Sequence, residues 1–278
     1  MPAAPTAELV SAARASGHGV AAFNVITLEH AEAIASAAEQ TGLPVILQIS
    51  ENAVKFHGGR PEPLIAATTA IACGAKVPVA VHLDHINSED LLRAGVAAGV
   101  TSVMFDACAL PYAENVEVTA RITAWAHERG VWVESELGEV GGKDGAHAPG
   151  VRTDPGEAAA FIAATGVDAL AVAVGSSHAM TERTAELDFD LITRLRAGVG
   201  VPLVLHGSSG VPDGDLRRAV TAGMTKINIG TALNVAFTAA VRDHLVAEPA
   251  VVDPRRYFRP ARAAMTSTVA HLLKVIAA

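Results

Sequence analysis

The chain has 278 residues, half of them apolar, so it is long enough to bury a large core. Its 21 Lys and Arg residues against 29 Asp and Glu residues give a formal charge of -8, and no stretch is rich in basic residues. This balance argues against nucleic acid or another polyanion as a partner. Charged, Gly or Pro residues interrupt every apolar stretch before about 18 residues, so no membrane span is expected.

The two cysteines, Cys73 and Cys108, are too few for a disulfide framework. The N-terminal segment MPAAPTAELV lacks the basic stretch and the apolar core of a signal peptide. We therefore expect a cytoplasmic protein. No linker, low-complexity tract or short repeat interrupts the chain, and we expect a single domain over residues 1–278.

Short β-branched runs alternate along the chain with longer stretches whose apolar residues recur at helical spacing. This alternation is typical of a parallel sheet with crossover helices. A first helix is predicted from Thr6 to Gly17, before any strand. The predicted strands then cover residues 19–25, 43–50, 77–84, 101–106, 131–136, 168–175, 202–207 and 226–230.

Helix start and stop signals lie between these strands. They predict helices from Thr27 to Gly42, from Asn87 or Ser88 to Gly99, from Asp154-Pro155 to Gly166, from Pro212 to Gly223, and a long one after Asp253-Pro254. Eight β/α units in this length predict a closed (β/α)8 TIM barrel, with an extra N-terminal helix and a long C-terminal helix.

One predicted loop is long, rich in glycine and poor in apolar side chains. It is GEVGGKDGAHAPG, from Gly138 to Gly150. Because loops of this kind in enzymes are often lids, we expect a mobile lid here.

Polar side chains stand at the ends of the predicted strands, which is where barrel enzymes carry their catalytic groups. They are Asn24, Ser50, Asp84, His85, Asp106, Glu136, His206 and Asn228, with His178 three residues past the sixth strand. A lone histidine after a strand is usually a helix cap or a hydrogen-bonded surface group. Three histidines at one barrel mouth instead favour a metal site.

Three protein ligands with an open position are typical of a catalytic zinc site, and His85, His178 and His206 supply three imidazoles. Zn²⁺ is the first choice, with Co²⁺, Fe²⁺ and Mn²⁺ as alternatives. Asp106 and Glu136 are expected either to orient ligand imidazoles or to hold the metal in a second, more buried position. Asp84 could also orient an imidazole or cap the next helix.

Glycines and hydroxyl groups follow the seventh and eighth strands. The stretches are HGSSG, residues 206–210, and NIGT, residues 228–231. Barrels commonly bind phosphate at this place through backbone N–H groups and a helix N-terminus. We therefore predict a phosphate site there.

Taken together, these motifs resemble the class II, zinc-dependent ketose-bisphosphate aldolases over nearly the whole chain. AFNV, QISE, HLDH, SVMFDA, VESELG, GVDALAVAVGSSH, LHGSSGVPD, KINIGT and DPRRYFRPAR follow in the family's order. Within that family, the chain looks most similar to the tagatose-bisphosphate and related fructose-bisphosphate aldolases of bacteria.

The resemblance implies a lyase of carbohydrate metabolism. Its members reversibly cleave fructose or tagatose 1,6-bisphosphate to dihydroxyacetone phosphate and an aldehyde phosphate. Cleavage leaves a carbanion next to a carbonyl, which a bound metal ion stabilises in place of a Schiff-base lysine. The resemblance also implies a homodimer or homotetramer.

The resemblance assigns roles to individual residues. His85, His178 and His206 would hold the catalytic zinc, Asp106 and Glu136 would match the alternative metal position, and Asp84 would carry the proton of the C4 hydroxyl. The substrate-binding residues would be Asn24, Ser50, Ala179, Gly207, Ser208, Ser209, Asn228, Ile229, Gly230, Thr231 and Arg255. Arg255 would bind the distal phosphate, with Arg256 and Arg259 as competitors, and a monovalent cation could also bind.

The chain departs from the family pattern at three places. Lys143 and Asp144 stand where the mobile loop usually has a glutamate-aspartate pair. Ala179 replaces a glycine, with Thr181 at the following aromatic position, and Cys108 replaces a common serine. The first departure leaves open which acid abstracts the proton in the step that forms the enediolate.

Three alternatives follow. The barrel could cleave a different sugar phosphate, such as a deoxy-ketogluconate phosphate, or bind a sugar phosphate without cleaving it. It could also be a metal-dependent hydrolase, since histidines and an aspartate at a barrel mouth suit water activation. The HxH pair that such hydrolases carry on their first strand is absent here.

Overall fold

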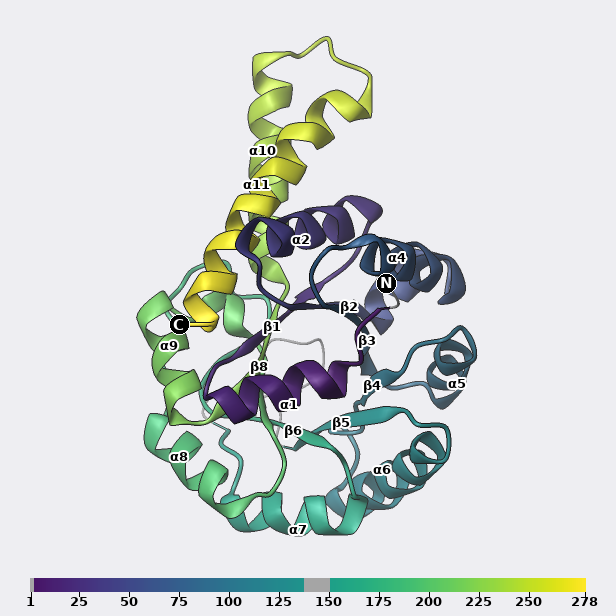
Figure 1. Ribbon diagram of the computed structural model, residues 1–278, viewed down its shortest axis with the longest axis vertical. Coiled ribbons are helices and arrows are strands. Elements are labelled where there is room, and N and C mark those ends of the chain that lie inside the picture. Colours follow the sequence, from purple (N-terminus) through teal and green to yellow (C-terminus); the bar gives the residue numbers. More distant parts are fainter. Residues whose placement is uncertain (1–2, 138–150) are drawn as a thin grey trace.

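The computed structural model describes residues 3–137 and 151–278, and its strands close into a parallel barrel in chain order (Figure 1). The strands are β1 (Val20–Asn24), β2 (Val45–Ser50), β3 (Val79–Ile86), β4 (Ser102–Phe105), β5 (Trp132–Leu137), β6 (Ala169–Val172), β7 (Leu203–Leu205) and β8 (Met224–Ile229). Strand β8 pairs with β1 and closes the ring. The predicted (β/α)8 barrel is confirmed.

Helices surround the barrel, and most of them link consecutive strands. They are α1 (Thr6–Ser16), α2 (Leu28–Thr41), α3 (Glu51–Phe56), α4 (Glu62–Gly74), α5 (Glu89–Ala97), α6 (Tyr112–His127), α7 (Pro155–Thr165), α8 (Phe189–Gly198), α9 (Asp213–Ala222), α10 (Thr231–Ala247) and α11 (Pro254–Ile276). The apolar core fills the layer between these helices and the strands. No helix in the described part of the chain is long and apolar enough to cross a membrane.

The predicted helix signals act as expected. Ser88 and Asp154 cap α5 and α7 with side-chain oxygens that accept backbone N–H groups. Gly42 and Gly166 end α2 and α7 in the left-handed conformation that favours glycine. The predicted ranges did not cover α3, α4, α6, α8 or α10.

Three predicted carboxyl ends of strands were wrong by two or more residues, and one of them is that of β7, which stops at Leu205 rather than at residue 207. Strand β6 stops at Val172 rather than Gly175, because Ala173 bonds to Thr153 instead of to a neighbouring strand. The Ala173 carbonyl accepts the backbone N–H of Thr153, and the Ala173 N–H donates to the Thr153 hydroxyl. Strand β3 runs on to Ile86, two residues beyond the predicted end at Asp84. Its register against β4 shifts between Leu83 and Ile86, which is a bulge.

Helix α1 lies across the end of the barrel where the strands begin (Figure 1). Its Leu9 and Val10 form an apolar cluster with inward residues of β1, β2 and β3, and its Thr6 hydroxyl lies 2.6 Å from that of Ser102. Further along the barrel, the interior becomes polar and encloses Glu134 and Lys226, both fully buried. The apolar cluster under α1 fills the end of the barrel where the strands begin. The opposite end, at the carboxyl ends of the strands, is therefore the place for a polar site.

Helices α10 and α11 form an antiparallel hairpin that projects from the barrel (Figure 1). Helix α11 also packs on α2, which anchors the base of the hairpin. Near the far end, Val246 and Val252 are 80% and 90% exposed.

Candidate metal centre and active site

A cavity of about 540 Å³ opens at the carboxyl ends of the strands. Its lining contains eleven of the predicted site residues, namely Asn24, Ser50, Asp84, His85, His178, Ala179, Gly207, Ser209, Asn228, Gly230 and Thr231. These residues come from both halves of the chain. The closed barrel thus brings together groups that are far apart in sequence.

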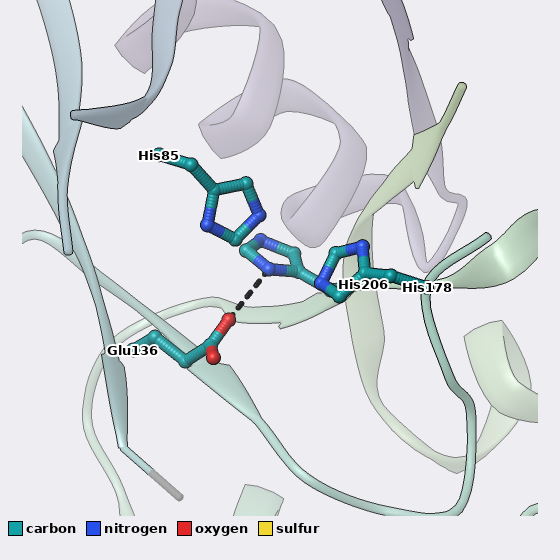
Figure 2. Close-up of side chains that lie close together, drawn as sticks. All are labelled: His85, Glu136, His178 and His206. Carbon is teal, nitrogen blue, oxygen red and sulfur yellow. Dashed lines mark ion pairs between the residues drawn. The ribbon is translucent and has the colours of Figure 1, made fainter. Parts of the chain in front are cut away.

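The three predicted histidines converge beside this cavity (Figure 2). The ring centroid of His85 lies 4.6 Å from that of His206 and 5.1 Å from that of His178. With Glu136, these residues offer ligand atoms that all lie within 4.8 Å of one another. Imidazole nitrogens and a carboxylate oxygen at this spacing fit a divalent transition-metal ion.

Carboxylates hold two of the imidazoles. Asp106 Oδ2 lies 2.7 Å from His85 Nδ1, and Glu136 Oε2 lies 2.7 Å from His206 Nδ1. Asp106 and Glu136 also form a second group of possible ligands with Cys108. These contacts agree with both predicted roles of Asp106 and Glu136, as orienting groups and as ligands of a second position.

The charge around His206 favours a cation. Burial opposes protonation of the ring, but hydrogen bonds to Glu134 and Glu136 outweigh burial and raise the pKa of His206 to about 9. Without a metal ion, the His206 ring is therefore a positively charged imidazolium at neutral pH, between the carboxylates of Glu134 and Glu136. A metal ion bound to the ring would replace one of its two N–H protons, and its positive charge would still neutralise the buried carboxylates.

The bulge in β3 explains how neighbouring residues can both face the cavity. Adjacent residues of a regular strand point to opposite sides. His85 instead adopts a left-handed backbone with φ 50, at the register shift between Leu83 and Ile86. Both Asp84 and His85 consequently line the cavity.

Two amides fix the carboxylate of Asp84. Asn24 Nδ2 donates to Oδ2 at 3.0 Å, and Asn228 Nδ2 donates to Oδ1 at 3.3 Å. Burial opposes the charge of Asp84, but the nearby charges of His85, Lys226 and His206 outweigh it and lower its pKa. Asp84 is thus held ionised beside the histidine cluster, as a proton acceptor requires.

Glycines and a helix N-terminus form the other side of the cavity. A Cβ at Gly207 would lie 2.6 Å from the backbone of Ser177, and one at Gly230 would lie 2.7 Å from Asn24 Oδ1. Gly230 also precedes α10, whose first residue Thr231 lines the cavity. This end of the cavity therefore exposes backbone and a helix N-terminus, which suits an anion.

Three predicted substrate residues have side chains engaged elsewhere. The Ser208 hydroxyl donates to the carbonyl of Leu205, and Ile229 is buried in the apolar core. Arg255 lies in the first turn of α11, where its guanidinium pairs with Asp253, and it does not line the described cavity. It lies at the start of α11, a helix of the projecting hairpin, and its role at a distal phosphate stays a prediction.

Sequence reasoning missed several residues of the site. Asn52, Asn87 and Asn234 line the cavity, and Gln48 donates to Asn24 Oδ1 at 3.0 Å. Gln48 stands two residues before Ser50 within a predicted buried strand, and this position could have indicated an inward polar side chain. The predicted lid, with Lys143 and Asp144, lies outside the described residues.

The model of one protein family, described as fructose-bisphosphate aldolase class-II, matches residues 4–278. The fructose-bisphosphate aldolase of Geobacillus stearothermophilus is 41% identical over 265 residues, covering 94% of this chain and 92% of that protein. The fructose-bisphosphate aldolase of Staphylococcus epidermidis is 39% identical over 272 residues, covering 97% and 95%.

A solved structure is also similar. The YdjI aldolase from Escherichia coli K12 superposes with a TM-score of 0.84 at 31% identity, covering 98% of this chain and 96% of that chain. The resemblance predicted from the sequence is confirmed by these matches over nearly the full length. The chain belongs to the class II fructose-bisphosphate aldolase family and is an aldolase that cleaves a ketose bisphosphate.

Proposed function

We propose that this chain is a zinc-dependent aldolase that reversibly cleaves fructose or tagatose 1,6-bisphosphate to dihydroxyacetone phosphate and an aldehyde phosphate. The observation that carries this proposal is the position of Asp84, an ionised carboxylate next to a three-histidine cluster in one cavity. The names of the bacterial relatives support fructose 1,6-bisphosphate as a substrate.

His85, His178 and His206 would hold the zinc ion, and Glu136 is close enough to share in its binding. When bound, such an ion supplies Lewis-acid stabilisation of the negative charge that develops at the substrate carbonyl. Asp106 keeps the His85 ring in place through its contact with Nδ1. That the metal ion has a second binding position, between Asp106, Cys108 and Glu136, also stays a proposal.

Asp84 would act on the substrate proton. During cleavage its carboxylate takes the proton of the C4 hydroxyl, and during condensation it returns that proton to the aldehyde oxygen. Asn24 and Asn228 each donate to one of its oxygens and thus fix its direction. Their neutral amides can do this without taking the proton themselves.

The glycine-lined end of the cavity would bind the phosphate of dihydroxyacetone phosphate. Backbone groups at Gly207 and Gly230, the Ser209 hydroxyl and the N-terminus of α10 surround this space. A phosphate bound there orients the reacting carbons without taking part in bond breaking, and such orientation is worth several kcal/mol. Ala179, in a left-handed backbone with φ 59, lines the same cavity. The monovalent cation expected from the resemblance would bind near the backbone of Ala179.

The projecting hairpin of α10 and α11 supports a homo-oligomer. Its exposed Val246 and Val252 would be covered by a second copy of the chain. Analytical ultracentrifugation of the protein and of Val246→Asp/Val252→Asp tests this, because the variant is expected to dissociate. The cytoplasmic location and the single domain over residues 1–278 stay predictions.

A panel of ketose phosphates tests the substrate. Zinc-loaded protein is incubated with fructose 1,6-bisphosphate, tagatose 1,6-bisphosphate and a deoxy-ketogluconate phosphate, and aldehyde release is measured. Cleavage of either bisphosphate with the highest kcat/KM supports the proposal. Preference for the third compound, or tight binding of all three without cleavage, contradicts it.

A further inference from the structure

Two opposite charges lie buried inside the barrel and do not line the cavity in which proton transfer and phosphate binding are proposed. Glu134 on β5 and Lys226 on β8 are both 0% exposed, and Lys226 Nζ lies 2.8 Å from Glu134 Oε2. Removing two charges from water is costly, and apolar residues of similar size are often equally stable or more stable at such positions. A buried pair of this kind calls for a reason beyond stability.

The second oxygen of Glu134 contacts a metal-site histidine. Glu134 Oε1 lies 3.0 Å from His206 Nε2 in a fully buried hydrogen bond. A carboxylate only accepts hydrogen bonds, so the proton of this bond belongs to Nε2. Nδ1 is then the ring nitrogen that His206 presents to the side of Glu136 and the cluster.

Lys226 is placed to hold the Glu134 side chain in the orientation in which Oε1 reaches His206. Its ammonium group donates a hydrogen bond to Oε2, the carboxylate oxygen that does not contact His206. Within the described residues, His82 is a further titratable group that faces Glu134, and its Nε2 lies 3.9 Å from Oε2. Burial and the charge of Lys226 lower the pKa of His82 to about 3, so it stays neutral and does not compete for the carboxylate.

We infer that Glu134, anchored by Lys226, is a positioning residue that fixes the tautomer and orientation of His206, so that Nδ1 is available to the metal ion. This inference rests on the proposed metal-dependent function. It assigns the buried pair to the assembly of the site, and Glu134 acts on the reaction only through His206.

Two double variants separate this role from a general need for the buried pair. Lys226→Met/Glu134→Leu and Lys226→Met/Glu134→Gln both lose the ion pair and both leave a neutral core. They differ in one respect, because the glutamine amide oxygen can still accept a hydrogen bond from His206 Nε2. The matched pair therefore isolates the acceptor.

Zinc affinity is measured by competition with a chromophoric chelator, and thermal unfolding of the metal-free proteins confirms that they fold. The leucine double variant is expected to bind zinc about 10 to 100 times more weakly than the wild type. The glutamine double variant is expected to recover most of that loss. Equal affinities of the two variants would overturn the inference, whereas a wild type without zinc at the cluster would overturn the proposed function and the inference with it.

A measurement on the wild type covers the case in which the leucine variant fails to fold. In zinc-loaded protein with ¹⁵N-labelled histidine, NMR is expected to show His206 with a slowly exchanging proton on Nε2 and the metal on Nδ1. A metal-bound Nε2 in His206 would overturn the inference, although the zinc site itself would stand.

Discussion

Asn24 and Asp84 are joined by a hydrogen bond of 3.0 Å across the mouth of the barrel, although 60 residues separate them in the chain. A second bond links Asn24 to Gln48, so three strands contribute to one polar chain that ends on the candidate proton carrier. The direction of Asp84 is therefore set by its neighbours, and four predictions follow from this site and its supports.

Replacing Asp84 by alanine tests its role in proton transfer. Asp84→Ala is expected to lower kcat by about 10²- to 10⁴-fold, because the C4 hydroxyl proton then has no positioned acceptor. Metal content should not change, since His85, Glu136, His178 and His206 are all retained. Steady-state kinetics and metal analysis of the same preparation check both parts, and wild-type turnover in the variant would remove Asp84 from the mechanism.

Gly230 and Asn24 are expected to act together. A Cβ at Gly230 would lie 2.7 Å from Asn24 Oδ1, so Gly230→Ala should push the amide away from Asp84 and lower kcat/KM. In an Asn24→Ala background the same change should cost much less, because the clashing group is gone. A double-mutant cycle measures this coupling. Gly200→Ala, which has open space around its Cβ, is the control, and additive effects would refute the link.

Glu51 is expected to stabilise the loop after β3 in its ionised form. Its Oε2 accepts the backbone N–H groups of Asn87 and Ser88. Burial alone would raise the pKa of Glu51, but the hydrogen bond and charge of Lys55 and the two backbone bonds outweigh burial and lower it from 4.5. The stabilisation is therefore fully present above about pH 4.5 and is lost as the pH falls through the lowered pKa.

Urea unfolding of wild type and Glu51→Gln measures this effect. The variant is expected to be less stable at pH 7 by about 1–2 kcal/mol, and the difference should shrink as the pH falls below 4.5. Glu62→Gln is a suitable control, because the Glu62 side chain is 51% exposed and lies 3.8 Å from its partner Arg60. A difference between wild type and Glu51→Gln that stays constant with pH would contradict the account.

The sequence predicted the barrel and the main site residues because both depend on local patterns. Apolar runs mark the strands, and a parallel barrel brings every strand end to one mouth, so polar residues such as Asn24, His85 and His206 could be placed together. The bulge at His85 was not predictable in the same way, because it depends on the register of β3 against β4.

Glu134 and Lys226 show a second limit. Each stands in an apolar run two residues before a predicted site residue, Glu136 or Asn228, and therefore on the same face of its strand. This signal was present, but the pairing across the barrel needs the structure. The position of Arg255 was not foreseen either, because the predicted elements included α11 but not α10, and the projecting hairpin requires both.

Zinc removal and restoration tests the central claim most directly. Protein treated with a strong chelator is titrated with zinc while cleavage of fructose 1,6-bisphosphate is followed. The account predicts that chelation abolishes cleavage, and that activity returns in proportion to added zinc until the three-histidine cluster is filled. Activity that survives complete chelation, with a substrate adduct trapped by borohydride, would contradict it and point to Schiff-base chemistry at a lysine.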